Sequence, residues 1–144
     1  MEKLRTIFLI AIMGLLFYSC SSSEDSKLEL FTPEAFAYYV GDAWELNVTL
    51  HAKGFTQKEN DSQYLYKLVY SLDLISPTKD TLTNIFSNIV KDTVQEKAED
   101  IELEAQTDLD STFSDGNYIV IIKVKDELSN QSARIKKKFN LSNK

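Results

Sequence analysis

The sequence is poor in the residues that build disulfides, metal sites and phosphate-binding loops. Its 144 residues include one cysteine (Cys20), one histidine (His51), four glycines and two prolines. A single cysteine cannot form an intrachain disulfide, and it cannot supply the several sulfur ligands of a zinc cluster. The glycines are scattered, so no glycine-rich loop for phosphate is present. We therefore expect no metal site and no cofactor.

The chain also lacks an excess of basic residues. It has 16 Lys and Arg against 22 Asp and Glu, which gives a net charge of -6 at pH 7. An acidic surface repels the phosphates of nucleic acids, so we expect no nucleic-acid partner. With 43% hydrophobic residues, the chain is long enough to form one domain with a sizeable core.

Charged residues are unevenly distributed along the sequence. Acidic residues are concentrated between residues 96 and 110, and basic residues are concentrated between residues 123 and 138. In a small domain, two segments of opposite charge can form neighbouring strands or faces whose side chains attract one another. We therefore predict that the acidic and basic segments lie side by side, in preference to an anion-binding patch.

Residues 1–19 have the three parts of a secretory signal peptide. A short start containing Lys3 and Arg5 precedes a run of mostly apolar residues, 7–17, and Ser19 provides a small residue at the boundary. The run is shorter than the roughly 20 apolar residues that span a bilayer. We predict a cleaved leader, with a retained membrane anchor or a buried N-terminal helix as the alternative.

The sequence Phe17-Tyr18-Ser19-Cys20 resembles the lipobox of bacterial lipoproteins. Ser19 fits the small residue that this motif places before its cysteine, whereas Phe17 and Tyr18 differ from the usual leucine and small residue. The resemblance implies that Cys20 is diacylated and becomes the new N-terminus. Two acyl chains hold a protein firmly at a membrane, where one chain would not. Ordinary cleavage after Ser21 is the alternative.

Residues 20–26 are polar after the cysteine, and we expect them to form a flexible tether behind an acylated Cys20. The acidic pair Glu24-Asp25 is similar to the export signal of Bacteroidota surface lipoproteins. This resemblance implies an outer-membrane lipoprotein at the cell surface, with the periplasmic face as the alternative. The membrane would then be one partner of the chain, through the lipid on Cys20.

Residues 27–144 are predicted to form one domain of β-strands, because apolar and polar residues alternate along several segments. In the last strand Lys137 interrupts the apolar face, which is typical of an edge strand that is protected from pairing with another chain. The last two strands are expected to form an antiparallel hairpin. The clearest strands are predicted at 44–52, 64–74, 101–105, 118–125 and 133–141.

The segment 81–98 has an ambiguous pattern. Leu82, Phe86 and Val90 belong to a set of apolar residues with helical spacing, and Asp80 could cap such a helix. The same segment is rich in β-branched residues, which favour strands. We favour one or two short strands and keep a helix as the alternative.

The pattern of elements predicts the all-β class. About seven strands, separated by turns and not alternating with helices, favour an immunoglobulin-like antiparallel β-sandwich. The run Asp115-Gly116-Asn117-Tyr118, with Asp126 and Asn130 after the next strand, resembles the last hairpin of bacterial immunoglobulin-like and fibronectin-type modules. Gly116 permits a positive φ at the corner, and Tyr118 can bury its ring while its hydroxyl bonds to the backbone.

No residue pattern marks the chain as an enzyme, and we predict no catalytic residue. His51 is expected on the polar face of a strand, without a nucleophile motif elsewhere in the sequence. Asp126, Glu127 and Asn130 could ligate calcium, but such residues far more often close a turn.

Aromatic residues give the only positive indication of binding. Tyr38, Tyr39 and Phe55 are the candidates for stacking on a ligand, and the alternative is that they belong to the core. We predict a non-catalytic, surface-exposed binding or accessory module whose ligand is a glycan or an envelope protein. A structural stalk or adhesin-like spacer is the first alternative, and a hydrolase that uses carboxylates alone is ranked last.

Overall fold

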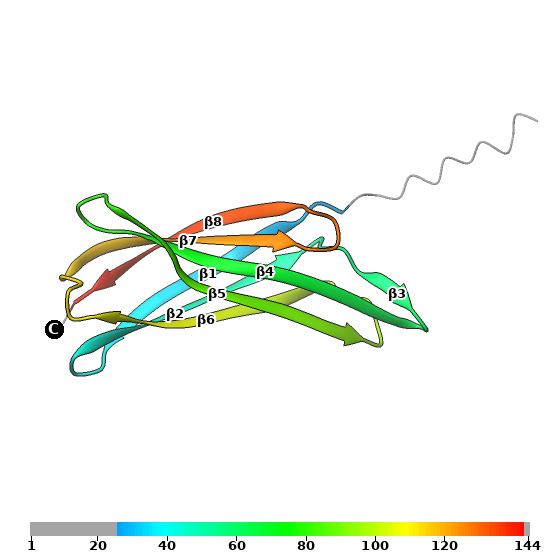
Figure 1. The fold of residues 1–144 in the computed structure, drawn as a ribbon, viewed down its shortest axis with the longest axis horizontal. Helices are drawn as coiled ribbons and strands as arrows, with labels where there is room; N and C mark the ends of the chain where they lie inside the picture. The colour runs from blue at the N-terminus through cyan, green and yellow to red at the C-terminus, as the bar shows by residue number, and fades with distance from the viewer. Residues whose placement is uncertain (1–25, 143–144) are drawn as a thin grey trace, which may run out of the picture.

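The computed structural model describes residues 26–142, which form an all-β domain of eight strands (Figure 1). No helix occurs in this part of the chain, so none of the described residues forms a membrane-spanning helix. All strand pairings are antiparallel, which confirms the predicted class. The strands are β1 (Glu29–Tyr39), β2 (Ala43–Lys53), β3 (Lys58–Asn60), β4 (Gln63–Ile75), β5 (Thr81–Val94), β6 (Asp100–Asp110), β7 (Gly116–Asp126) and β8 (Ser132–Leu141).

Two sheets pack face to face with their strands running along the long axis of the domain (Figure 1). One sheet has the order β1-β2-β6. In the other sheet β8, β7, β4 and β5 are neighbours in that order, and the short β3 pairs with the first residues of β4. At the two sides of the sandwich, β1 lies next to β8 and β5 lies next to β6. The seven long strands form the predicted sandwich, with the three-residue β3 as an addition.

The core lies between the sheets because each strand presents every second side chain inward. Burial alternates residue by residue along β2 from Trp44 to Ala52, as the sequence predicts, and the pattern repeats in β4 and β7. Burying one large apolar side chain contributes about 1.5–3 kcal/mol. Within residues 26–142, the buried apolar residues lie between Leu28 and Leu141, so a chain that begins at Ser26 keeps all of the described core.

The ambiguous segment forms one long strand, β5, and the helical alternative is wrong. β5 pairs with β4 along its length, with a bulge where Asn84 has a φ of +56° and its backbone N–H donates to the Asp73 carboxylate. Because β5 is an edge strand, its inner side carries packed Phe86 and Val90 with exposed Asn88 between them. Apolar residues four apart on one strand face therefore imitated the spacing of a helix.

β1 is a strand that the sequence analysis did not assign. A bulge interrupts its pairing with β2 between Phe31 and Glu34, and Thr32 there has a φ of +46°. The bulge shifts the alternation by one residue, so no single period describes the whole strand.

The corner before β7 has the geometry that the sequence predicts for Gly116 and Tyr118. Tyr118 is only 2% exposed, and its hydroxyl donates to the Ser114 carbonyl at 2.9 Å. Gly116 has a φ of +151°, and a Cβ at this position would lie 2.8 Å from the Pro77 ring. This is the tyrosine-corner arrangement of immunoglobulin-like sandwiches.

The acidic and basic segments do not lie side by side, and that prediction is wrong. β6 pairs only with β2, and β8 pairs only with β7, so the two segments belong to different sheets. Their outward side chains cover opposite surfaces of the sandwich. The acidic face, on the β1-β2-β6 sheet, carries Glu29, Glu34, Glu45, Asp100, Glu102, Glu104, Asp108 and Asp110. The basic face, on the other sheet, carries Lys67, Lys91, Lys123, Lys125, Arg134, Lys136 and Lys138.

The described chain enters the sandwich through a fixed segment. The Ser26 hydroxyl donates to the Gly54 carbonyl, and the Gln131 side chain bonds both the Leu28 N–H and the Ser26 carbonyl. A Cβ on Gly54 would lie 2.1 Å from the Lys27 carbonyl oxygen, so only glycine fits there. The predicted leader, the predicted acylation site Cys20 and most of the predicted tether lie outside the described residues.

Candidate functional site

Exposed aromatic rings gather at the end of β1 and in the turn that follows it. Phe36 and Tyr38 are 40% and 54% exposed, and their ring centroids lie 5.2 Å apart. The two residues are two positions apart on one strand, so both rings project from the outer face of the β1-β2-β6 sheet. The next two residues, Tyr39 and Val40, are exposed as well, but Tyr39 leaves the strand on the opposite face, on the side of Trp44. Within residues 26–142, four of the six exposed large apolar side chains lie in this short stretch.

The predicted stacking residues divide into three cases. Tyr38 is freely exposed, as predicted. Tyr39 is also exposed, but its ring packs at 5.1 Å against the buried Trp44, so part of its role is to cover the core. Phe55 is only 2% exposed and lies 5.2 Å from the Tyr66 ring, so its prediction as a ligand-stacking residue is wrong.

Phe36 is the exposed ring that the sequence analysis missed. It lies between the half-buried Ala35 and Ala37, which face the other way toward the core. That alternation is visible in the sequence only once β1 is recognised as a strand, because the bulge at Thr32 breaks the pattern before it.

Polar side chains complete the surface around the two rings. Phe36, Asn47 and Gln106 are register partners in one row across β1, β2 and β6, and Tyr38, Glu45 and Asp108 form the next row. The Asn47 amide donates to the Glu45 carboxylate at 3.1 Å. A shallow hollow of about 420 Å³ lies over the first row. We define the aromatic site as Phe36, Tyr38, Asn47, Glu104 and Gln106, four of which line this hollow.

The aromatic site has the chemistry for binding a polar ring such as a sugar. An aromatic ring offers an apolar face for stacking, while amide and carboxylate groups exchange hydrogen bonds with hydroxyls. Asn88 of β5 also lines the hollow and donates its amide to the Tyr70 hydroxyl at 3.2 Å. The polar groups therefore come from β2 and β6 of one sheet and from β5 of the other sheet, which lies next to β6.

Two carboxylates on this face lie close enough to each other to be considered for hydrolysis. Glu45 and Asp108 are direct cross-strand partners, so their Cβ atoms are about 5 Å apart. Both project from an outer sheet face, and neither belongs to a group of His, Cys, Asp and Glu residues arranged to hold a metal ion within residues 26–142.

His51 forms a hydrogen bond with a side chain of a neighbouring strand. Its Nδ1 atom lies 3.1 Å from the Asp100 carboxylate, and its ring lies 5.4 Å from the Phe31 ring. No hydroxyl or thiol among the described residues hydrogen bonds to the imidazole. The arrangement lacks the nucleophile that a catalytic triad requires.

Asp126 closes the last turn instead of opening a calcium site. Its buried carboxylate accepts hydrogen bonds from the N–H groups of Thr56 and Leu128, at 2.7 and 2.9 Å, and from the Ser129 hydroxyl at 2.8 Å. Burial alone would raise the pKa of Asp126, but these hydrogen bonds outweigh it and hold the pKa below its ordinary value. The carboxylate thereby joins the β7–β8 turn to the segment after β2.

No protein-family model matches this sequence, and no curated protein sequence matches it. One solved structure that resembles it is a family 123 glycoside hydrolase from Clostridium perfringens, described in a study of glycolipid glycan hydrolysis. The identity is 15% and the TM-score is 0.49. The similarity covers 82% of this chain and 28% of that enzyme, so the chain spans less than a third of its length. A likeness this distant bears on neither activity nor ligand.

Proposed function

We propose that this chain is a non-catalytic binding module of the bacterial cell envelope, and that its aromatic site holds a glycan. The observation that supports the proposal is the pairing of exposed rings with amides. The ring centroids of Phe36 and Tyr38 lie 5.2 Å apart on a sheet face, and Asn47 and Gln106 lie in the same cross-strand row as Phe36. A spacer has no need of two exposed rings in register with hydrogen-bonding groups, since exposing large apolar side chains is unfavourable.

The position of the site along the domain is consistent with an anchor at the N-terminus. The described chain begins at one end of the long axis, and the turn after β1 lies at the other end (Figure 1). The 11 residues of β1 span about 35 Å. A lipid on Cys20 would therefore place the aromatic site at the end of the domain that is farther from the membrane.

A glycan suits the aromatic site better than a protein partner. The hollow is shallow and mixes hydrogen-bonding side chains with apolar ones, as stacking on a sugar requires, whereas protein-binding hot spots are well-packed, fully desolvated pockets. A protein ligand is the second candidate, and it is favoured only by the continuous apolar run from Tyr38 to Val40.

Oligosaccharide titration monitored by NMR tests the proposal. We expect neutral oligosaccharides to shift the amide signals of β1 and β2, and Tyr38→Ala to weaken binding about tenfold because one stacking ring is lost. Ile89→Ala is the matched control, because Ile89 is 56% exposed on the other sheet. Unchanged affinity in Tyr38→Ala, or no binding in a broad oligosaccharide panel, would show that the site does not hold a glycan.

The same samples test the absence of catalysis. Chromatography of the oligosaccharides after long incubation should show them intact. Glu45 is the cross-strand partner of Asp108. If cleavage products form and are absent with the Glu45→Gln variant, the chain is a carboxylate-based hydrolase and not a non-catalytic binding module.

A further inference from the structure

The basic face carries more positive charge than its own carboxylates can neutralise. Among residues 26–142 only two of its cations form ion pairs: Lys123 with Asp73 at 2.8 Å, and Lys125 with Glu127 at 3.0 Å. The other five cations of this face have no ion-pair partner within the described chain. This surface therefore presents a positive potential although the whole chain is acidic.

Like charges are placed directly opposite each other on this face. Lys67 of β4 is the register partner of Lys91 of β5, and Lys123 of β7 is the partner of Arg134 of β8. Directly opposed like charges destabilise a sheet, so the Lys67–Lys91 pair weakens the fold in the absence of an anion. Lys123 is already paired with Asp73, which offsets its repulsion of Arg134. A bound anion would relieve the repulsion between Lys67 and Lys91.

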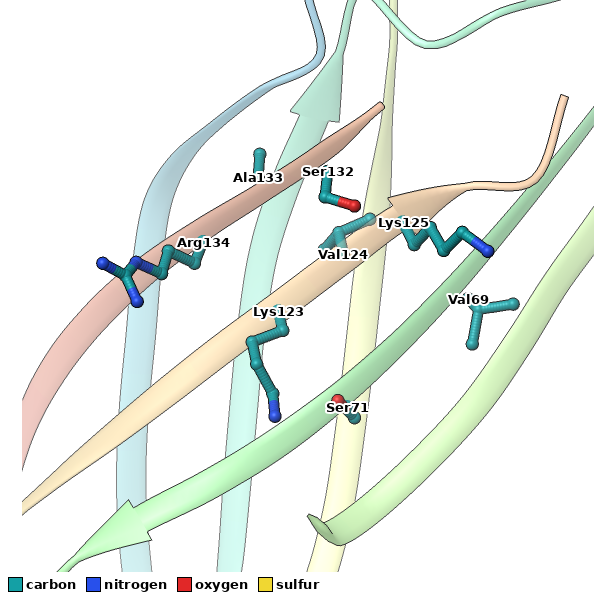
Figure 2. A pocket seen from close by; sticks show the side chains of 8 residues that line it. All are labelled: Val69, Ser71, Lys123, Val124, Lys125, Ser132, Ala133 and Arg134. Atoms are coloured by element: carbon teal, nitrogen blue, oxygen red, sulfur yellow. The ribbon is translucent and has the colours of Figure 1, made fainter. Parts of the chain in front are cut away.

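The centre of the basic face is hollowed between cationic side chains. A hollow of about 450 Å³ lies over β4, β7 and the start of β8. Figure 2 shows Lys123 extending toward Ser71 and Lys125 extending toward Val69, while Arg134 leaves β8 on the far side of Lys123. The Ser71 hydroxyl adds a hydrogen-bonding group between the charges. The small side chains of this region leave room for anionic groups next to the ammonium groups.

The cations form rows rather than a single convergent cluster. Arg134, Lys136 and Lys138 occupy every second position of β8, and Lys123 and Lys125 occupy every second position of β7. Neighbouring cations in a row are therefore about 7 Å apart along the strand. One small anion could contact only one or two of them, whereas a polymer with repeated anionic groups could contact a whole row.

From this arrangement we propose that the basic face binds an acidic polysaccharide, a glycan chain with repeated carboxylate, sulfate or phosphate groups. The distance between the two charged faces supports this proposal. The carboxylates of the acidic face lie on the opposite sheet, about 10 Å or more from the basic face, so salt screens their effect on an anion bound there. Single-stranded nucleic acid fits less well, because the outward side chains of β4, β5, β7 and β8 include no aromatic ring on which bases could stack.

A binding titration of the chain from Ser26 onward with heparin and with a polyuronate tests the proposal. We expect binding at about 20 mM salt that weakens steeply toward about 500 mM, because bound counterions are released. The double variant Arg134→Glu/Lys136→Glu should bind at least about tenfold more weakly, since two adjacent cations of one row are reversed. Inorganic sulfate at the same equivalent concentration should not compete, because it cannot bridge a row.

The matched control is Lys53→Glu/Lys97→Glu, which changes the net charge equally. Lys53 lies on the β1-β2-β6 sheet and Lys97 lies in the segment between β5 and β6, so neither belongs to the basic face. We expect this variant to bind the polysaccharides nearly as the unaltered chain does. Equal weakening in both double variants would overturn the proposal, because net charge alone would then explain the binding.

Three further measurements separate the polysaccharide from other occupants. Tighter binding to vesicles of anionic lipid, or to single-stranded DNA, than to either polysaccharide would overturn the assignment to a glycan. Self-association that is lost in Arg134→Glu/Lys136→Glu, without polysaccharide binding, would assign the face to the acidic face of a second copy instead. The proposal is independent of the aromatic site, so Tyr38→Ala should bind heparin unchanged.

Discussion

The Asp126 carboxylate shows how one buried charge can be stabilised by hydrogen bonds alone. Three donors surround it, and no lysine or arginine forms an ion pair with it among the described residues. The sequence indicated that Asp126 closes a turn, but it could not show the contact with Thr56, which lies 70 residues away. Such a contact depends on how β2 and β7 are brought together in the two sheets.

Asp126→Asn should lower the free energy of unfolding at pH 7 by about 1–3 kcal/mol, because the uncharged amide cannot satisfy all three donors. The folded pKa lies below the unfolded value of about 3.9, so this stability is present above that pH and is lost as pH falls through the folded pKa. Urea unfolding at pH 7 and pH 3 should therefore show a smaller difference between the two chains at pH 3. Glu127→Gln, which removes a charge from the same turn, should show little change. An equal difference at both pH values would contradict the assignment.

At the scale of the strand, the sequence was most informative where one face is continuously apolar. β2, β4, β7 and β8 were predicted within a few residues, because their inner faces pack against a full sheet. β1 and β5 were missed or left open, because both are edge strands interrupted by bulges. Some side chains on the inner side of such a strand remain in contact with solvent and can be polar. The alternation of apolar and polar residues along the strand is therefore incomplete.

The β4–β5 pair gives a prediction about stability. Lys91→Glu should raise the free energy of unfolding by about 0.5–1 kcal/mol, because it replaces repulsion with attraction opposite Lys67. Lys138→Glu is the control, because its partner is the uncharged Ile119 and no gain is expected. The measurement is urea unfolding at low salt, and the gain should shrink as salt is added. A loss of stability in Lys91→Glu would show that the two opposed lysines do not destabilise the fold.

At the scale of the whole molecule, the sequence showed how many acidic and basic residues each segment carries, but not which surface of the domain they occupy. Which sheet an acidic or basic strand joins is decided by long-range topology, and β6 and β8 were assigned to opposite sheets only by the structure. The candidate sites followed the same rule. Tyr38 was found from its residue type, whereas Phe36, Asn47 and Gln106 became neighbours only through the pairing of three strands.

The proposed membrane anchor is tested on the complete chain. Cys20→Ala should prevent acylation, so the variant should lose incorporation of labelled fatty acid and move from the membrane fraction to the soluble fraction. Cys20→Ser is a conservative companion that should behave in the same way. Retention of either variant at the membrane would mean that another part of the chain holds it there.

The fixed entry segment at Ser26–Leu28 has a mechanical consequence. A ligand held by Phe36 or Tyr38 and a tether pulled at Ser26 would apply opposing forces to the two ends of β1. Both forces would act on β1 itself, so its covalent backbone would carry the tension, while the hydrogen bonds to β2 would bear little of it. A predicted tether and a ligand on these rings would thus be joined through a single strand, and the rest of the sandwich could stay folded under the pull.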